Sequence, residues 1–132
     1  MKLRFIYVAS KNVRHEVEFQ VKSLGARLNW WFDRFGAQVA SLSVGPGPQL
    51  LVASHLEDGQ VIWIYEVENL ERAKAEFQTL GAKNQGDLEI PNGPCARFDS
   101  GNGRQIALFE DLRPGAMEEA YADETNSARV FL

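Results

Sequence analysis

The start of the chain changes from a strand-like pattern of side chains to a helix-like one. Residues 3–9 are rich in aromatic and β-branched side chains, which is typical of a strand. Apolar residues then recur three or four positions apart, with charged residues between them, at Val13, Val17, Val21 and Leu24. This spacing predicts a helix that Ser10 or Asn12 caps and Gly25 ends. Three further strand-like stretches follow at 27–33, 38–44 and 49–54.

The second half of the chain repeats this order. Residues 60–67 (QVIWIYEV) predict a strand, Asn69 can cap the helix that follows, and Gly81 ends it. The apolar face of this helix consists of Leu70, Ala73, Phe77 and Leu80. Weaker strand patterns follow at 87–90, 95–98 and 105–109. Each half therefore predicts the order strand, helix, strand, strand, strand.

Two matching fragments indicate that this order is a tandem duplication. The first helix closes with EFQVKSLGA (18–26) and the second with EFQTLGA (76–82). From LGA onward the halves align without a gap at an offset of 56 (80 − 24), which carries GPGPQ at 45–49 onto GNGRQ at 101–105. Two fragments that agree in register and in element order are the sign of a repeated structural unit.

The duplication defines the expected domain organisation. We predict one domain over residues 1–112, with module one at 1–56 and module two at 57–112. Residues 113–132 differ in composition, being mostly polar with an apolar end, and form a C-terminal tail. Two interpretations of the tail stay open: a frayed terminus, or a dimer arm that packs on a partner subunit.

Composition and charge narrow the range of partners. The chain has 132 residues, of which 45% are apolar and 24% charged, with a net charge of −4, so no basic surface for nucleic acid is expected. No apolar run reaches the length of a membrane span, and residues 1–10, interrupted by Arg4, do not read as a signal peptide. The single cysteine, Cys95, cannot form an internal disulfide and is expected to be a packed residue. We therefore expect a cytoplasmic protein whose partners include neither nucleic acid nor a membrane.

The doubled strand–helix–three-strand module resembles a known superfamily. Leu-Gly follows each helix, the stretch YEVENLERA (65–73) joins a strand to a capped helix, and GNGRQIALFE (101–110) closes the repeat. Over about residues 3–112 this order is similar to the glyoxalase / bleomycin-resistance / extradiol-dioxygenase superfamily, also called vicinal oxygen chelate proteins. The resemblance implies an α+β fold of two tandem βαβββ modules whose curled mixed sheets surround a cavity. It also implies a homodimer.

The resemblance places the metal ligands of the family's enzymes at residues that carry no donor atom. Those enzymes hold a divalent metal with His, Glu or Gln on the first and last strand of each module. The four equivalent positions in this chain are Leu3, Leu51, Ile62 and Ala107. Because such a cation needs oxygen, nitrogen or sulfur ligands, we predict no metal and no cofactor, and metal-dependent catalysis is not expected.

No other pattern assigns a catalytic residue. His15 lies between charged residues of the first helix, and His55 lies near Glu57 and Asp58 in what reads as a polar loop. Tyr7 and Glu66 could act as an acid and a base inside the cavity, and the sequence leaves that open.

Strand alternation identifies the side chains that would line the cavity. In QVIWIYEV, the resemblance turns Trp63, Tyr65 and Val67 toward the helix and the residues between them toward the cavity. Trp30 and Trp31 are adjacent on one strand and must point to opposite faces, so only one of them meets the ligand. The predicted ligand contacts are Phe5, Tyr7, Trp31, Ile62, Ile64, Glu66, Phe98, Ala107 and Phe109.

Three functions are consistent with these residues. The first is a metal-independent binding protein that sequesters a small aromatic or amphipathic molecule in an apolar cavity. The alternative is a lyase- or dioxygenase-like enzyme of the same superfamily with an atypical site, using Tyr7, Glu66 or His55. The third is a scaffold subunit whose cavity is filled by its own side chains.

Overall fold

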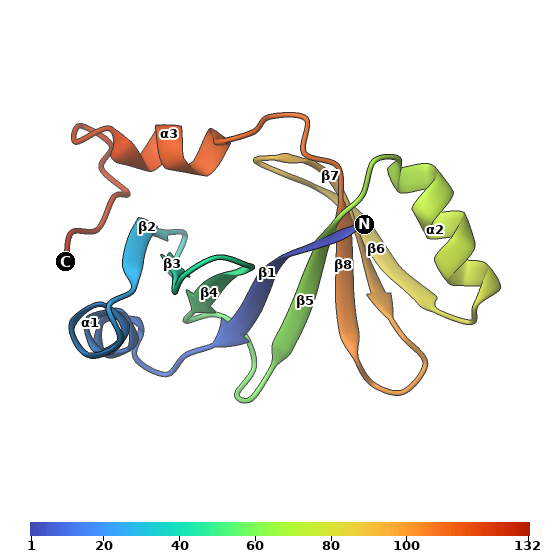
Figure 1. The fold of residues 1–132 in the computed structure, drawn as a ribbon, viewed down its shortest axis with the longest axis horizontal. Coiled ribbons are helices and arrows are strands. Elements are labelled where there is room, and N and C mark those ends of the chain that lie inside the picture. The colour runs from blue at the N-terminus through green and yellow to red at the C-terminus, as the bar shows by residue number, and fades with distance from the viewer. The chain divides into compact units, whose positions relative to one another are not determined.

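The computed structural model describes residues 1–132 as eight strands and three helices (Figure 1). None of the three helices has both the length and the apolar run that a membrane span requires. The order strand, helix, strand, strand, strand occurs twice, which confirms the predicted α+β class. The elements are β1 (Lys2–Ala9), α1 (Val13–Leu24), β2 (Arg27–Arg34), β3 (Ala37–Ser43), β4 (Gln49–Ala53), β5 (Val61–Glu66), α2 (Leu70–Thr79), β6 (Lys83–Ile90), β7 (Gly93–Asp99), β8 (Gln105–Phe109) and α3 (Ala116–Ala122).

The chain divides into two compact units, each built around one βαβββ repeat. The first module contains residues 5–61 together with the C-terminal residues 117–132. The second module contains residues 62–116 together with the N-terminal residues 1–4. Each is described here by itself.

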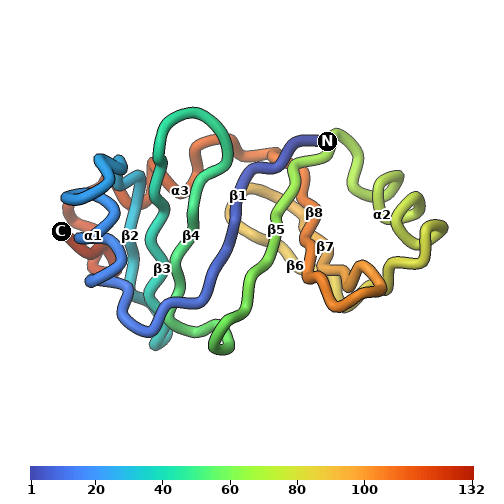
Figure 2. The backbone as a smooth tube through the Cα atoms, turned by 60° about the horizontal axis from the view of Figure 1, so that its bottom comes forward, coloured from blue at the N-terminus to red at the C-terminus, as the bar shows by residue number.

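In the first module, α1 packs on one face of a four-stranded sheet. The strands lie in the order β2-β3-β4-β1, with β1 parallel to β4 and the other pairs antiparallel (Figure 2). Asn12 caps α1, because its side chain accepts a hydrogen bond from the His15 amide at 3.0 Å, and Gly25 ends the helix in the left-handed conformation. The core beneath α1 contains Val13, Val17, Ala26, Trp31, Ala40, Leu42 and Val52.

The second module repeats this arrangement with α2 and the strand order β5-β8-β7-β6 (Figure 2). Asn69 caps α2 through the Arg72 amide at 3.0 Å, and the Glu110 carboxylate accepts from the Leu70 amide at 2.6 Å. The core beneath α2 contains Val67, Leu70, Ala73, Ala96, Phe98 and Leu108. Its edge strand β6 begins four residues earlier than the sequence predicted. The early part is polar and exposed and has a register shift between Asn84 and Gly86, so it lacks the alternation that marks a half-buried strand.

Register defines two faces in each sheet, because residues directly paired across strands project to the same side. In the first module, one row of paired residues packs under α1 and consists of Trp31, Ala40, Val52 and Val8. The residues that come directly before and after these in each strand project to the opposite side of the sheet, which we call the helix-distal face. In the second module, Tyr65 and Val67 pack with the core beneath α2, as the resemblance implied. Ile62, Ile64 and Glu66 therefore lie on the helix-distal face of that sheet.

The C-terminal segment packs on the first module of its own chain. Tyr121 is the buried residue of α3, and its ring lies against Phe32 of β2. Beyond α3, the Asp33 amide donates to the Ala128 carbonyl at 2.8 Å and the Val130 amide donates to the Trp31 carbonyl at 2.9 Å. The segment thereby pairs with the edge of β2, which would otherwise expose unpaired backbone groups. Whether it also reaches a partner subunit stays a prediction.

Candidate functional site

The helix-distal face of the first module brings aromatic, apolar and polar side chains together. One row of directly paired residues crosses all four strands and consists of Trp30, Ser41, Leu51 and Tyr7. The next row consists of Phe32, Val39, Ala53 and Ala9. Tyr7 belongs to the first of these rows, and Phe5 lies two residues before it in β1. Both of these predicted ligand contacts therefore lie on the same face of the strand.

A cluster of neutral polar side chains lies on this face. The Ser41 hydroxyl donates to the Gln49 side-chain oxygen at 2.7 Å, and the Asn29 amide donates to Ser43 at 2.8 Å and to Ser41 at 3.2 Å. Ser41 is fully buried, and Asn29 lies where the register of β2 shifts. We did not single out this cluster from the sequence. The signal was present in the alternation Ala-Ser-Leu-Ser at 40–43, where every second residue is a serine.

Tyr7 and His55 form a pair at the β1 end of the row that consists of Trp30, Ser41, Leu51 and Tyr7. The phenol oxygen of Tyr7 lies 3.3 Å from Nε2 of His55, and the two rings meet edge to face at a centroid distance of 6.1 Å. Burial raises the pKa of Tyr7 to about 12, because it disfavours the phenolate. The phenol is therefore protonated at neutral pH and can donate a hydrogen bond.

The helix-distal face of the second module is charged at one end. Ile62, Ile64 and Glu66 are paired in register with Gln105, Ala107 and Phe109. Arg4 forms an ion pair with Glu66 and a second one with Asp111 at 3.1 Å, and its guanidinium lies 5.8 Å from the centre of the Phe109 ring. Burial by itself lowers the pKa of Arg4, but hydrogen bonds and charge from the two carboxylates outweigh it and the pKa is raised.

This network was not visible in the sequence. Arg4 is separated from its two carboxylate partners by 62 and 107 residues. Glu66 was predicted as a ligand contact. Because Arg4 already neutralises it, a cationic ligand would have to compete with an internal ion pair.

Two of the predicted ligand contacts are wrong. Trp31 is only 1% exposed and belongs to the core beneath α1, where Arg14 lies 4.6 Å from its ring. Trp30 is the tryptophan that projects to the helix-distal face. Phe98 is fully buried beneath α2, with its ring 5.5 Å from that of Phe77. The error has one cause: a strand places alternate residues on opposite faces, and the sequence did not fix which set meets the helix.

Register also corrects the position in the first strand that corresponds to Ile62. Ile62 is paired with Gln105, and the residue paired with the corresponding Gln49 is Phe5, not Leu3. The helix caps support this correspondence, because Asn12 lies seven residues after Phe5 and Asn69 lies seven residues after Ile62 (12 − 5 and 69 − 62). Phe5 supplies no metal donor either. Nowhere in residues 1–132 do three His, Cys, Asp or Glu side chains gather in a way that could hold a metal ion.

Cys95 is paired with Phe109 on the second module and is buried. Burial raises the pKa of its thiol to about 11. A thiol that stays protonated at neutral pH is a poor nucleophile, so its role is that of a packed residue.

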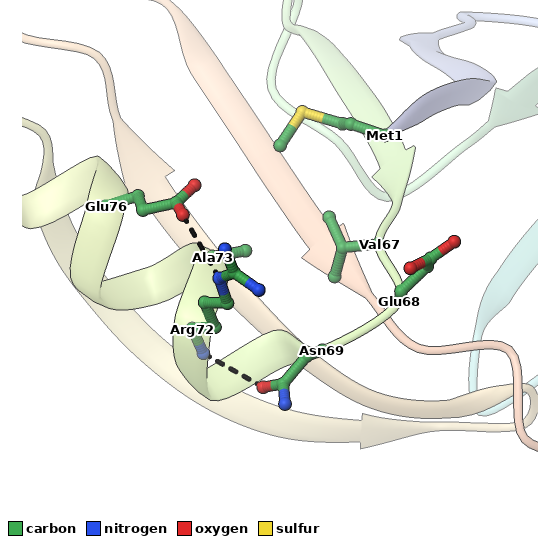
Figure 3. A pocket seen from close by; sticks show the side chains of 7 residues that line it. All are labelled: Met1, Val67, Glu68, Asn69, Arg72, Ala73 and Glu76. Atoms are coloured by element: carbon green, nitrogen blue, oxygen red, sulfur yellow. Dashed lines mark hydrogen bonds and ion pairs between the residues drawn. The ribbon is translucent and has the colours of Figure 1, made fainter.

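A shallow groove lies on the second module at the start of α2 (Figure 3). Its volume is about 270 Å³, at the lower end of small-molecule sites. Three of its polar side chains are already engaged, since Arg72 pairs with Glu76 at 3.5 Å and Asn69 caps the helix. The groove therefore contributes no further group to the candidate site on the helix-distal faces. The lining residues are Met1, Val67, Glu68, Asn69, Arg72, Ala73 and Glu76.

Comparison with known proteins identifies the class of fold. No family model and no curated protein matches the chain. Among solved structures, the hypothetical protein BH1468 from Bacillus halodurans C-125 is similar with a TM-score of 0.72 at 18% identity, over 85% of this chain and 95% of that one. Methylmalonyl-CoA epimerase from Mycobacterium tuberculosis gives 0.68 at 16% identity, over 85% and 89%. A selenomethionine form of methylmalonyl-CoA epimerase gives 0.69 at 13% identity, over 86% and 97%.

These similarities confirm the fold that the sequence predicted. The chain has the fold of the glyoxalase / bleomycin-resistance, or vicinal oxygen chelate, superfamily, with eight strands and two helices in two βαβββ repeats, followed by α3. At such low identity the similarity establishes the fold and leaves the chemistry to the residues of this chain.

Proposed function

We propose that this protein binds a small molecule with an aromatic or apolar body on the helix-distal face of a module, without a metal ion. The observation that carries the proposal is the residue set at the four equivalent strand positions. These hold Phe5, Leu51, Ile62 and Ala107, and none has an oxygen, nitrogen or sulfur donor. Apolar side chains at these places favour burial of an apolar ligand over coordination of a cation.

The surroundings of Leu51 favour a ligand that also carries a neutral polar group. Leu51 is paired with Tyr7 on one side and with Ser41 on the other. The protonated Tyr7 phenol can donate a hydrogen bond to a carbonyl or hydroxyl oxygen. A ligand with a flat apolar body and one such oxygen would match this row.

The same proposal includes sequestration without turnover by a homodimer. The resemblance to the superfamily supports it. Size-exclusion chromatography with light scattering measures the dimer directly, and a monomer at working concentration would remove that part of the proposal.

The binding function is tested by native mass spectrometry of purified protein, followed by a thermal-shift screen of aromatic compounds. We expect a compound that raises the melting temperature of the wild-type protein and has no effect on Leu51→Gln, which introduces a polar amide into the row. The matched control is Leu88→Gln, because Leu88 is exposed on β6. Equal stabilisation of wild type and Leu51→Gln by every compound would contradict the proposal.

The Tyr7–His55 pair favours a second candidate, an enzyme with an atypical site. Several similar solved structures are methylmalonyl-CoA epimerases, which are enzymes. In this alternative, the Tyr7 phenol donates a hydrogen bond to a substrate carbonyl and polarises it. His55, whose Nε2 lies 3.3 Å from the phenol oxygen, exchanges a proton with that phenol. If a compound found in the screen is turned over, Tyr7→Phe and His55→Gln should each lower the rate. Unchanged turnover in both variants would reject this candidate.

A further inference from the structure

Helix α3 packs on the sheet of the first module through the aromatic ring of Tyr121. Tyr121 is the buried residue of this seven-residue helix. Its ring is stacked on Phe32 at a centroid distance of 5.0 Å and an interplanar angle of 20°. It also lies 6.4 Å from the ring of Trp30. One side chain of α3 therefore contacts two rings of β2, stacked on Phe32 and tilted against Trp30, while Asn126 and Arg129 donate hydrogen bonds to the Ala120 and Ala122 carbonyls at the end of the helix.

Trp30 and Phe32 form a flat aromatic surface beneath Tyr121. Both project to the helix-distal face of β2, and their rings are stacked at 5.9 Å with an interplanar angle of 16°. Parallel rings of this kind accept a further ring by offset stacking. We call this pair the Trp30–Phe32 shelf. It belongs to the same face, and in part to the same row, as Leu51 and Tyr7.

The segment that follows α3 contributes two apolar residues to the module, the buried Ala128 and Val130, which packs against the core beneath α1, and is otherwise held at the edge of the sheet. The Ala128 carbonyl and the Val130 amide bond to the backbone of β2. Arg14 donates to the Phe131 carbonyl at 3.3 Å. Elements with few buried contacts open locally at a small fraction of the cost of global unfolding.

We propose that the Trp30–Phe32 shelf is a stacking subsite for a flat aromatic group, and that Tyr121 occupies it in the ligand-free protein. This inference rests on the proposed binding function, because it names the class of group that the helix-distal face accepts. A ligand ring displaces the Tyr121 ring, and α3 with the segment after it moves away from β2. The C-terminal segment is thus an internal competitor for the ligand.

The competition has a measurable consequence. If the open form makes up about 1–10% of the molecules, the apparent affinity for a ring on the shelf is about 10- to 100-fold weaker than the intrinsic affinity. Removing the Tyr121 ring removes this penalty. Removing the backbone pairing of residues 128–130 lowers it, because the segment then opens more often.

The test is calorimetric titration of the full-length Tyr121→Ala variant with 2-naphthol, a flat two-ring probe. We expect binding at one probe per chain, at least about tenfold tighter than to wild type. The double variant Tyr121→Ala/Phe32→Ala should lose this binding, and Tyr121→Phe, which keeps the ring, should bind like wild type. Affinity of Tyr121→Ala within twofold of wild type, or binding that persists in the double variant, would overturn the proposal.

Two further variants separate a specific subsite from exposed apolar surface. Phe77→Ala removes a ring that lies on Phe98 beneath α2, and it should create no tight one-to-one site. A chain ending at Asn126 keeps Tyr121 but lacks the residues that pair with β2, so it should bind the probe more tightly than wild type does. Tight one-to-one binding to Phe77→Ala, or wild-type affinity in the shortened chain, would count against the subsite.

The outcomes also distinguish this inference from the proposed function. If a screened compound binds wild type through Leu51 but ignores Tyr121→Ala, the subsite is rejected and the binding function stands. If no compound binds wild type while 2-naphthol behaves as expected in Tyr121→Ala, the binding function fails and the shelf stands as a site that Tyr121 keeps closed.

Discussion

The two modules share one topology but place different chemistry on their helix-distal faces. In the first module the polar groups are neutral, and Ser41 and Asn29 bond to each other and to their neighbours. In the second module the polar groups are charged, with Arg4 between the carboxylates of Glu66 and Asp111. The comparison shows that register fixes which positions share a face, while the residue at each position decides what the face can bind.

The largest expected effect compares two phenylalanines that differ in burial. Phe98→Ala should lower the free energy of unfolding by about 3–5 kcal/mol, because it leaves a cavity beneath α2. Phe35→Ala is the matched control, since that side chain is 98% exposed. Urea denaturation measures both. A loss below about 1 kcal/mol for Phe98→Ala would show that this ring does not support the helix-facing core.

The second prediction concerns pH and the partly buried phenol of Tyr7 in the first module. The pKa of Tyr7 is raised from 10.0 to about 12, so above pH 10 the unfolded chain releases a proton that the folded chain retains. The stability contributed by the protonated phenol is complete below pH 10 and falls as the pH rises toward 12, by about 2–3 kcal/mol in total. Tyr7→Phe should lack this loss.

Urea denaturation of wild type and Tyr7→Phe between pH 8 and pH 11.5 checks this. Both proteins share every other titrating group, so only the difference between their pH profiles is read. Parallel profiles would mean that Tyr7 titrates as in the unfolded chain.

The third prediction tests the charged end of the second module. Arg4→Met should cost about 1–2 kcal/mol of folding free energy, because it leaves two partly buried carboxylates without their shared cation. The double variant Arg4→Met/Asp111→Asn should recover part of the loss, since one unpaired charge is removed. Additive losses in the double variant, measured by thermal and urea unfolding, would argue against coupling between these residues.

The smallest expected effect compares the two helix caps. Asn12→Ala should cost about 1 kcal/mol. Asn69→Ala should cost less, because the Glu110 carboxylate also accepts from the first turn of α2. Unfolding free energies of the two variants measure the difference, and a larger loss for Asn69→Ala would contradict the supporting role of Glu110.

The fold could be predicted from the sequence because its signals are local. Asn12 and Asn69 cap helices where expected, and Gly25 ends the first one. The repeated fragments LGA and Gly-x-Gly-x-Gln then indicated that the second half of the chain repeats the element order of the first half. The polar early part of β6 and helix α3 lay outside these patterns.

The candidate site was predicted less well because its determinants are not local. Which of Trp30 and Trp31 faces away from α1 depends on a register shift in β2, and Phe98 was assigned to the wrong face for the same kind of reason. The partners of Arg4 and the ring beneath Tyr121 lie far away in the sequence, so no spacing rule could identify them.

The most direct test of the central claim is calorimetric titration of the wild-type protein, in buffer with EDTA, with a compound from the screen. We expect stoichiometric binding whose affinity is the same with and without the chelator, since Phe5, Leu51, Ile62 and Ala107 supply no metal donor. Binding that disappears in EDTA and returns with a divalent metal would contradict it.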